Sequence, residues 1–447
     1  MQKQSKKIFK SSLDIGKYFF FIGLFLLPSA ISLSVIFLLI SLIISFVEDF
    51  KNKFKDKINL IFLISCLLLS ISSIVNFLDK SSINNYTNNG SLTFIGLLNW
   101  IPMIFAFIGF QKYLLFKEER KNCIKILIFG SIPVIYSCFA QFLFNWHGPM
   151  KTLYGLIVWY QRPIEGFSGI TGLFNNPNYL AAWLNIIWPF CLGMIFFDNK
   201  NKVKVFFKII LIISISLLIV LTYSRAGWIG LLIPILFYRS TIKLCFLTLI
   251  TFIPLIGLNL FFPFLATEFY QMIQKFIPRG IWINFTPREY QSLDISRLEI
   301  WRYATKFIQN NPIFGHGSRA FTSLLREETG LWKGHSHNLP LELMVNYGIP
   351  VALFILLPII YLLLKAHIKL FIQNFKLNKN YVFDRAWTIS LTSLIVMHMV
   401  DIQYFDGRIS IAGWILLAGT RNIVFINEQT QDLIEQDVNN YSDKVSS

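Results

Sequence analysis

The chain has 447 residues, of which 54% are hydrophobic and only 15% are charged, and its mean hydropathy is +0.55. Soluble domains carry about 25% charged residues, so this composition excludes an ordinary soluble protein and indicates an all-α polytopic membrane protein. The net charge of +17 comes from Lys and Arg residues between hydrophobic runs, where topology signals belong, and it does not indicate a nucleic-acid partner.

The apolar runs predict about twelve transmembrane helices, because a span needs about 20 apolar residues. The first run, 18–47, is too long for one span, and Pro28-Ser29-Ala30 divides it into two short helices. Seven further spans are predicted at 59–78, 93–116, 124–144, 179–197, 205–223, 226–238 and 243–265. The last three are predicted at 349–365, 386–400 and 409–425.

The distribution of charge predicts the orientation. With a cytoplasmic N-terminus at 1–17, the short cytoplasmic segments carry 24 Lys and Arg residues and the short outer segments carry 5. This imbalance satisfies the positive-inside rule and supports an even number of spans. The predicted regions are spans 1–9 at 18–265, an extracytoplasmic loop at 266–348, spans 10–12 at 349–425 and a cytoplasmic tail at 426–447.

The long outer loop between spans 9 and 10 is predicted to be partly helical. A capping Ser296 and a terminating Asn311-Pro312 bound the first helix. A second short helix is predicted near 318–327, and Asn338 can cap a third helix that ends near Gly348. The apolar stripe at helical spacing that predicts the first helix consists of Ile295, Leu298, Trp301, Ala304 and Ile308.

Four arginines are predicted on the outer side of the membrane. Arg225 lies in a very short turn between two apolar helices, where an ionisable residue is costly unless it has a partner. Arg297 and Arg302 flank the stripe of the first loop helix, and Arg162 lies in a loop before Pro163. Each of them could simply face solvent or the membrane interface, whereas together they could clamp a phosphate or diphosphate.

A histidine pair, His335 and His337, opens the third loop helix. An imidazole at a membrane surface can accept a proton near neutral pH, so His337 is predicted to be a general base, with His335 as an alternative base or a neighbour that orients it. A purely structural role for either histidine is also open. Glu342, one helical turn beyond Asn338, could tune or hold an imidazole. The sequence contains no HxxxH or HExxH pattern, so we expect no metal and no other cofactor.

Three amides precede the span at 179–197, in the run Gly172 to Asn178. Asn and Pro at such a boundary often form only a turn and a helix cap. Amides at the outer surface, Asn178 among them, could equally bind sugar hydroxyls. The residues alone leave these alternatives open.

Four local patterns resemble the O-antigen ligase/polymerase family of bacterial membrane glycosyltransferases. They are Gly-Leu-Phe-Asn-Asn-Pro-Asn at 172–178, Ser-Arg at 224–225, Ser-Arg-x-x-x-Trp at 296–301 leading to Asn-Pro-Ile-Phe-Gly-His-Gly at 311–317, and His-Asn at 337–338 followed by Gly-Ile-Pro at 348–350. The resemblance covers about residues 160–365.

The resemblance implies transfer of a glycan from an undecaprenyl-diphosphate carrier to the hydroxyl of a glycan or lipid acceptor, without a metal and on the extracytoplasmic face of the bacterial inner (plasma) membrane. It implies that Arg225 and Arg297 hold the carrier diphosphate and that His337 activates the acceptor. The residues themselves make six further positions candidates for supporting roles: His335, Arg162, Arg302, Asn178, Asn338 and Glu342.

Two other functions are compatible with parts of the pattern. Relatives with these motifs have been labelled inorganic-carbon transporters, and the arginines could form an anion site for bicarbonate. A carrier's site should lie near the bilayer midplane in two related halves, whereas here the ionisable residues gather on one face. A structural or assembly protein would leave the histidine and arginine set unexplained.

Overall fold

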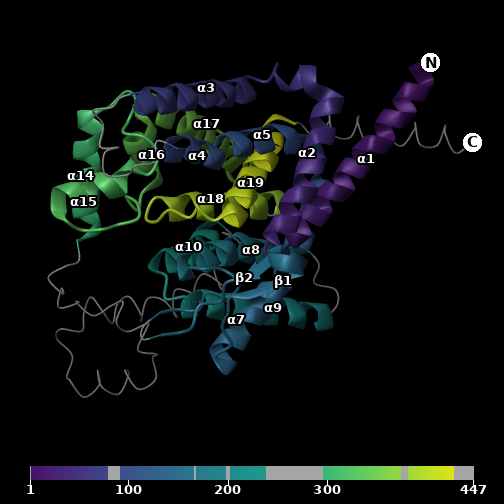
Figure 1. Ribbon diagram of the computed structural model, residues 1–447. Helices are drawn as coiled ribbons and strands as arrows, with labels where there is room; N and C mark the ends of the chain where they lie inside the picture. The colour runs from purple at the N-terminus through teal and green to yellow at the C-terminus, as the bar shows by residue number, and fades with distance from the viewer. Residues whose placement is uncertain are drawn as a thin grey trace, which may run out of the picture.

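A computed structural model describes residues 2–78, 91–165, 168–197, 202–237, 295–373 and 381–426 of the chain. The described part is almost entirely helical (Figure 1). Its one small sheet pairs β1 (Met150–Thr152) with β2 (Ile157–Trp159) in antiparallel register, with Met150 opposite Trp159. The predicted all-α class is therefore confirmed.

The N-terminal half contains α1 (Gln2–Leu26), α2 (Ile31–Lys53), α3 (Lys57–Leu78), α4 (Ser91–Ile95), η2 (Gly96–Asn99), α5 (Ile101–Phe110), η3 (Gln111–Leu114), α6 (Lys117–Gly130), α7 (Ile132–Phe144), η4 (Leu153–Gly155), α8 (Pro177–Phe197), α9 (Lys202–Leu221) and α10 (Arg225–Phe237). The C-terminal half contains α14 (Arg297–Asn310), α15 (Ala320–Thr329), α16 (Leu339–Tyr347), α17 (Ile349–His367), η6 (Ile368–Gln373), α18 (Val382–His398) and α19 (Gly407–Phe425).

Seven helical stretches in the described part are long and apolar enough to cross a membrane. The predicted division of the first run is confirmed, because α1 ends at Leu26 and α2 begins at Ile31. Two predicted single spans are interrupted: 93–116 comprises α4, η2, α5 and η3, and 124–144 is broken at Ser131, just before Pro133. The predicted span at 243–265 lies outside the described residues, so the total of twelve remains a prediction.

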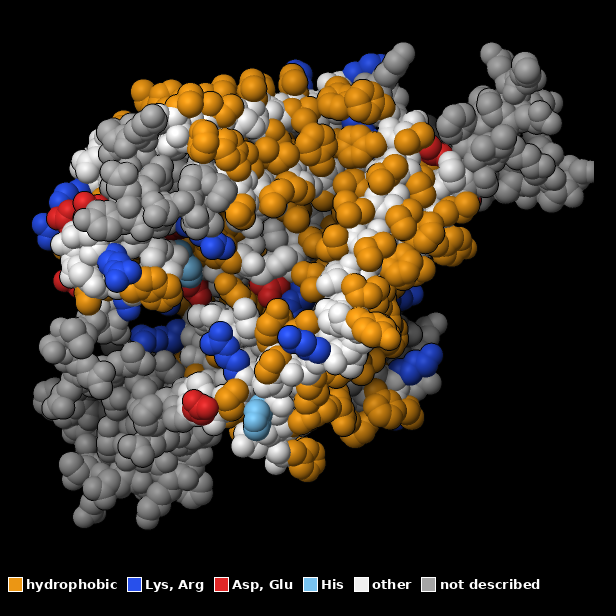
Figure 2. Space-filling view, viewed as in Figure 1, with side chains coloured by type: hydrophobic (Ala, Val, Ile, Leu, Met, Phe, Trp, Pro, Cys, Tyr) orange, Lys and Arg blue, Asp and Glu red, His pale blue; other side chains and the backbone are white. Residues whose placement is uncertain are grey.

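Two helices, α8 and α18, form the centre of the bundle. They pack against each other, and Trp183 and Trp387 are fully buried between their neighbours. Gly419 allows α19 to pack closely against α18, because a Cβ atom there would lie only 2.6 Å from the Trp387 ring. By contrast, α2, α3, α9 and α17 leave many large apolar side chains exposed, as expected of helices that face lipid (Figure 2).

The helices α14, α15 and α16 form a small separate core at one end of the bundle, which we call the loop end (Figure 1). Ser296 caps α14 in a reciprocal arrangement with Glu299, as the sequence predicted for Ser296. Leu298, predicted to be in the apolar stripe, is instead 75% exposed. Ile300 and Phe307 are buried in its place, because the buried face is rotated from the predicted one.

The pattern Asn-Pro-Ile-Phe-Gly-His-Gly attaches this core to the membrane helices. Its backbone pairs with the end of α16 and the start of α17, where the Ile349 N–H donates to Pro312 at 2.7 Å and the His316 N–H donates to Val345 at 2.8 Å. The Phe314 carbonyl accepts from Asn76 of α3 at 2.9 Å. Gly348 has φ of 88°, and any Cβ there would collide with the Ile313 carbonyl.

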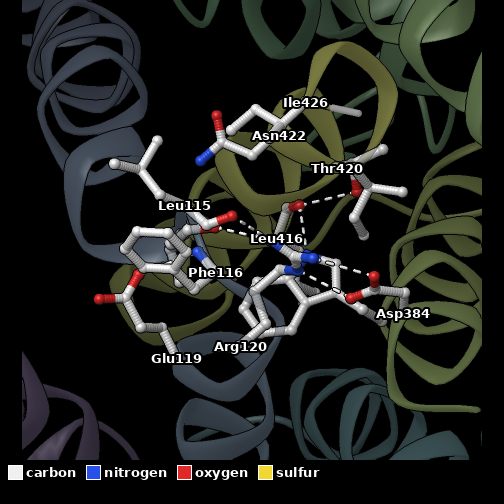
Figure 3. A network of polar contacts seen from close by, with 12 residues as sticks. Leu115, Phe116, Glu119, Arg120, Asp384, Leu416, Thr420, Asn422 and Ile426 are labelled. Carbon is white, nitrogen blue, oxygen red and sulfur yellow. Dashed lines mark hydrogen bonds and ion pairs between the residues drawn. The ribbon is translucent and has the colours of Figure 1, made fainter. Parts of the chain in front are cut away.

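A buried ion pair holds the helices together at the opposite end of the bundle (Figure 3). The Arg120 guanidinium of α6 donates to both oxygens of Asp384 in α18, at 2.7 and 2.9 Å. It also donates to the Leu114 and Leu115 carbonyls at 2.9 Å. Both side chains are at most 5% exposed, so this ion pair links α6 and α18 in the interior.

Candidate active site

The structure pairs His337 with an aspartate that is distant in the sequence. His337 Nδ1 lies 2.8 Å from Asp401 Oδ1, and Asp401 follows the end of α18 directly. His337 has a φ of 55°, a left-handed conformation that is uncommon for a residue other than glycine. The next residue, Asn338, caps α16 through its side-chain oxygen and donates to the Met399 carbonyl at 2.9 Å. Asn338 thereby joins α16 to the end of α18 and fixes the position of His337.

The second histidine packs against the first. The His337 backbone N–H donates to His335 Nδ1 at 3.1 Å, and the two rings lie edge to face with centroids 4.3 Å apart. His335 also stacks on Phe405. Burial lowers the pKa of His335 to about 4, an effect to which the charges of His337 and Arg297 contribute and which Asp401 opposes. His335 is therefore neutral at physiological pH, with its Nδ1 committed as an acceptor.

The aspartate is charged and largely shielded from solvent. Burial alone would raise the pKa of Asp401, but the hydrogen bond with His337 and the electrostatic interactions with both histidines outweigh burial, and the net pKa is lowered. The Asp401 side chain is 4% exposed and the His337 side chain 26% exposed. An ionised carboxylate only accepts hydrogen bonds, so His337 Nδ1 carries the proton and its Nε2 keeps a lone pair. Nε2 has no hydrogen-bond partner among the described residues.

Glu342 does not contact an imidazole, contrary to the possibility that its position suggested. Its carboxylate accepts from the Ser336 backbone N–H at 2.8 Å and from the Asn346 side chain at 3.0 Å. Burial raises the pKa of Glu342, and these hydrogen bonds oppose that effect. Glu342 therefore supports the backbone between the two histidines, and Asp401 takes the role of carboxylate partner to His337.

The outer arginines differ in their distance from the histidine pair. Arg297, at the start of α14, is exposed and lies within electrostatic range of His335. Arg302 is exposed one turn further along α14. Arg225 and Arg162 are also exposed, and no described contact joins either of them to the histidines. Arg297 is therefore the outer arginine with an electrostatic effect on the pair in the described part of the chain.

Contacts of Arg408 connect the segment 172–178 to the turn that contains Asp401. Arg408, at the start of α19, lies with its guanidinium carbon 3.7 Å from the centre of the Phe174 ring and donates to the Leu173 carbonyl at 3.1 Å. Arg408 also pairs with Asp406, which lies in the same turn as Asp401. Asn178, predicted to be a sugar contact, is half-buried in the first turn of α8, where its backbone N–H donates to the Asn176 side chain.

The turn that holds Arg225 lies beside this segment. The Ile170 N–H donates to the Leu221 carbonyl at 3.1 Å, immediately before the turn at 222–224. The Asn185 side chain of α8 donates to the Gly227 carbonyl at 3.0 Å, which fixes α10 against α8. The start of α10 therefore lies beside Ala181 and Asn185 of α8. Arg408 links the segment before α8 to the turn at 399–406, which contacts the histidine pair.

Sequence reasoning missed two residues near the histidines. Asp401 is an acidic residue at the end of an apolar span, and the cost of placing such a group there was the available signal. Arg319 precedes α15 with φ of 60° and lies with its guanidinium carbon 5.9 Å from the centre of the Phe405 ring, which His335 stacks on. No local pattern distinguishes Arg319, because only the fold brings it to Phe405.

The same three side chains could hold a metal ion. The ligand atoms of His335, His337 and Asp401 all lie within 4.8 Å of one another, the one such group found in the described part of the chain. Spacing along the sequence could not predict this group, because Asp401 comes from another helix end. Two nitrogens, His335 Nδ1 and His337 Nδ1, already take part in hydrogen bonds. The expectation of no metal therefore remains a prediction.

Comparison with known proteins agrees with the motifs. Residues 209–356 match the family described as O-antigen ligase, and the matched stretch contains Arg225, Arg297, His335 and His337. It also contains 238–294, outside the described residues. A comparison with curated proteins found no match. The predicted resemblance is confirmed for residues 209–356, which are similar to the O-antigen ligase family, and the apolar helices of the described part indicate a multi-pass membrane protein.

Proposed function

We propose that this protein transfers a glycan from an undecaprenyl-diphosphate carrier to a hydroxyl group of a glycan or lipid acceptor. The reaction takes place at the loop end, on the extracytoplasmic face of the bacterial inner membrane. The observation that carries this proposal is that His337 Nε2 has no hydrogen-bond partner in the described part of the chain, on an imidazole whose Nδ1 is fixed by Asp401. Ligase and polymerase reactions share this chemistry, and they differ only in the acceptor.

The acceptor hydroxyl gives its proton to His337 Nε2 as its oxygen attacks the anomeric carbon of the first sugar. The new carbon–oxygen bond forms while the bond between that carbon and the carrier phosphate oxygen breaks, and the diphosphate leaves with the electron pair. Asp401 holds the ring in the required tautomer and stabilises the imidazolium that forms. This arrangement needs no metal for proton transfer.

The negative charge on the leaving diphosphate requires a cation. Arg297 is the proposed first partner, because it is exposed and lies within electrostatic range of His335. Arg225 is the proposed second partner, at the start of a helix packed against α8. Guanidinium groups suit this role, since they bind phosphate oxygens through two parallel hydrogen bonds. Arg162, Arg302 and Asn178 are proposed to contact the glycan or the diphosphate at the rim.

The test replaces His337, Arg225 and Arg297 by Ala, one at a time, and examines surface polysaccharide on gels. We expect each variant to lose chain growth or attachment while the protein remains in the membrane at normal levels. The matched control is Arg326→Ala, which removes an exposed arginine from α15. Unchanged polysaccharide in all three test variants would refute the proposal.

The findings give no support to the alternative function as an inorganic-carbon transporter. The family match is to a ligase, and a His–Asp pair with a free nitrogen has no evident use in moving bicarbonate. Transport is therefore not proposed.

A further inference from the structure

A groove of about 780 Å³ lies far from the candidate active site. It runs between the start of α3, one face of α17 and the end of α19. From Lys57, at the start of α3, to Asn76, which binds the loop end, the helix rises about 28 Å. The groove therefore opens toward the opposite end of the bundle from His337.

The wall of the groove is apolar and exposed. Leu353, Leu357 and Tyr361 follow one another at four-residue spacing, so they share one face of α17. They are 42%, 57% and 42% exposed, whereas Ile355 and Leu362 of the same helix are fully buried. Because α17 is apolar enough to span a membrane, this exposed face meets hydrocarbon chains in the bilayer.

The rim of the groove carries two lysines. Lys55 and Lys57 are both exposed and flank Asp56. Asp56 is already neutralised, since it pairs with Arg421 and accepts from the Asn59 N–H at 2.9 Å. Lys57 has no hydrogen-bond or ion-pair partner within the described ranges. The charge of Lys57 is therefore not cancelled by this aspartate.

We propose that the groove binds an anionic phospholipid of the surrounding bilayer. One acyl chain lies along Leu353, Leu357 and Tyr361, and the headgroup phosphate lies between Lys55 and Lys57. Basic pockets between transmembrane helices recognise acidic headgroups in this way. This site is independent of glycan transfer, because it shares no residue with the candidate active site and opens at the opposite end of the helices.

The test measures retention of phosphatidylglycerol and phosphatidylcholine by the purified full chain, using native mass spectrometry in detergent. We expect phosphatidylglycerol to be retained preferentially and the variant Lys55→Gln/Lys57→Gln to bind it roughly tenfold more weakly or worse, since each lysine near an anionic surface contributes to binding. The matched control Lys202→Gln/Lys204→Gln removes two exposed lysines from the start of α9 and should bind normally.

A second variant, Leu357→Trp, fills the groove and leaves both lysines in place, so it tests the acyl-chain contact separately. It should also lose phosphatidylglycerol. Equal retention of the two lipids, or undiminished binding by both test variants, overturns the proposal. Displacement by inorganic phosphate would show a free-phosphate site, and equally strong competition by undecaprenyl phosphate would show a carrier site. Either result also overturns it.

Discussion

Helix α18 has an aspartate near each end, and the two aspartates have different partners. Asp384, in the first turn, binds Arg120 through two hydrogen bonds, with both side chains at most 5% exposed. Asp401, just beyond the last turn, binds His337 through one hydrogen bond, and the histidine is 26% exposed. Arginine keeps its proton under all physiological conditions, whereas histidine exchanges one near neutral pH.

The two partners suit the two aspartates to different roles, one in stability and one in proton transfer. At the buried end the carboxylate pairs with a permanent cation whose guanidinium also binds backbone carbonyls, so the ion pair can only hold helices together (Figure 3). At the loop end the carboxylate fixes one nitrogen of an imidazole and leaves the other available to a substrate. The same residue type therefore has a stabilising role at one end of the helix and, in the proposed reaction, positions the general base at the other.

The largest expected effect is on folding, from Arg120→Leu. This variant leaves the Asp384 carboxylate buried without its cation, which costs about 3–5 kcal/mol. We expect the amount of folded protein in the membrane to fall sharply, as measured by size-exclusion chromatography in mild detergent. The double variant Arg120→Leu/Asp384→Leu should recover much of it, because no charge is then left unpaired. If the double variant does not recover, the loss of folded protein does not come from an unpaired buried charge.

The second prediction concerns how the free energy of unfolding changes with pH because of His335. The unfolded chain binds a proton on His335 below about pH 6.5, whereas the folded protein does so only below about pH 4. The contribution of His335 to the free energy of unfolding should thus be largest above pH 6.5. It should fall by up to about 3 kcal/mol as the pH drops to 4. The variant His335→Asn should make this decline smaller, as measured by thermal unfolding followed through tryptophan fluorescence.

The exposed His147 provides the control for that measurement. His147→Asn should leave the decline between pH 6.5 and 4 as it is in the unaltered protein. If both variants show the full decline, burial of His335 does not determine the acid sensitivity.

The smallest expected effect is that of metal removal. If His335, His337 and Asp401 act through hydrogen bonds alone, EDTA should change the transfer rate by less than about twofold, because no Lewis acid is needed for proton transfer to His337. A purified transfer assay with and without the chelator makes the measurement. Loss of activity that added zinc or manganese restores would instead show that the three side chains hold an ion.

The sequence allowed much of the fold to be predicted, because the physical signals were local. Apolar length, Pro28 and the caps Ser296 and Asn338 each determine structure within a few residues. The broken helices α4–α5 and α6–α7 were not anticipated, since composition alone does not distinguish an interrupted apolar run from a continuous one. The exposed position of Leu298 was also missed, because which face of α14 is buried depends on its contacts with α15 and α16.

Only part of the candidate site could be predicted, because local patterns locate the histidines but not their partner. The histidines are adjacent to a helix cap, so their placement at the loop end followed from local patterns. Their partner Asp401 lies 64 residues from His337 and reaches it only through the packing of α16 against the end of α18. Glu342 is the carboxylate nearest to His337 in the sequence, yet it accepts hydrogen bonds from Ser336 and Asn346 instead.

The most direct test of the different roles of Asp384 and Asp401 replaces each of them by asparagine and measures glycan transfer per folded molecule. Asp401→Asn should fold normally and transfer at least about 100-fold more slowly, since the amide cannot stabilise the imidazolium of His337. Asp384→Asn should yield less folded protein, and each folded molecule should transfer at the unaltered rate. An unaltered rate in Asp401→Asn, or an equal loss of rate per folded molecule in Asp384→Asn, would contradict the separation of the two roles.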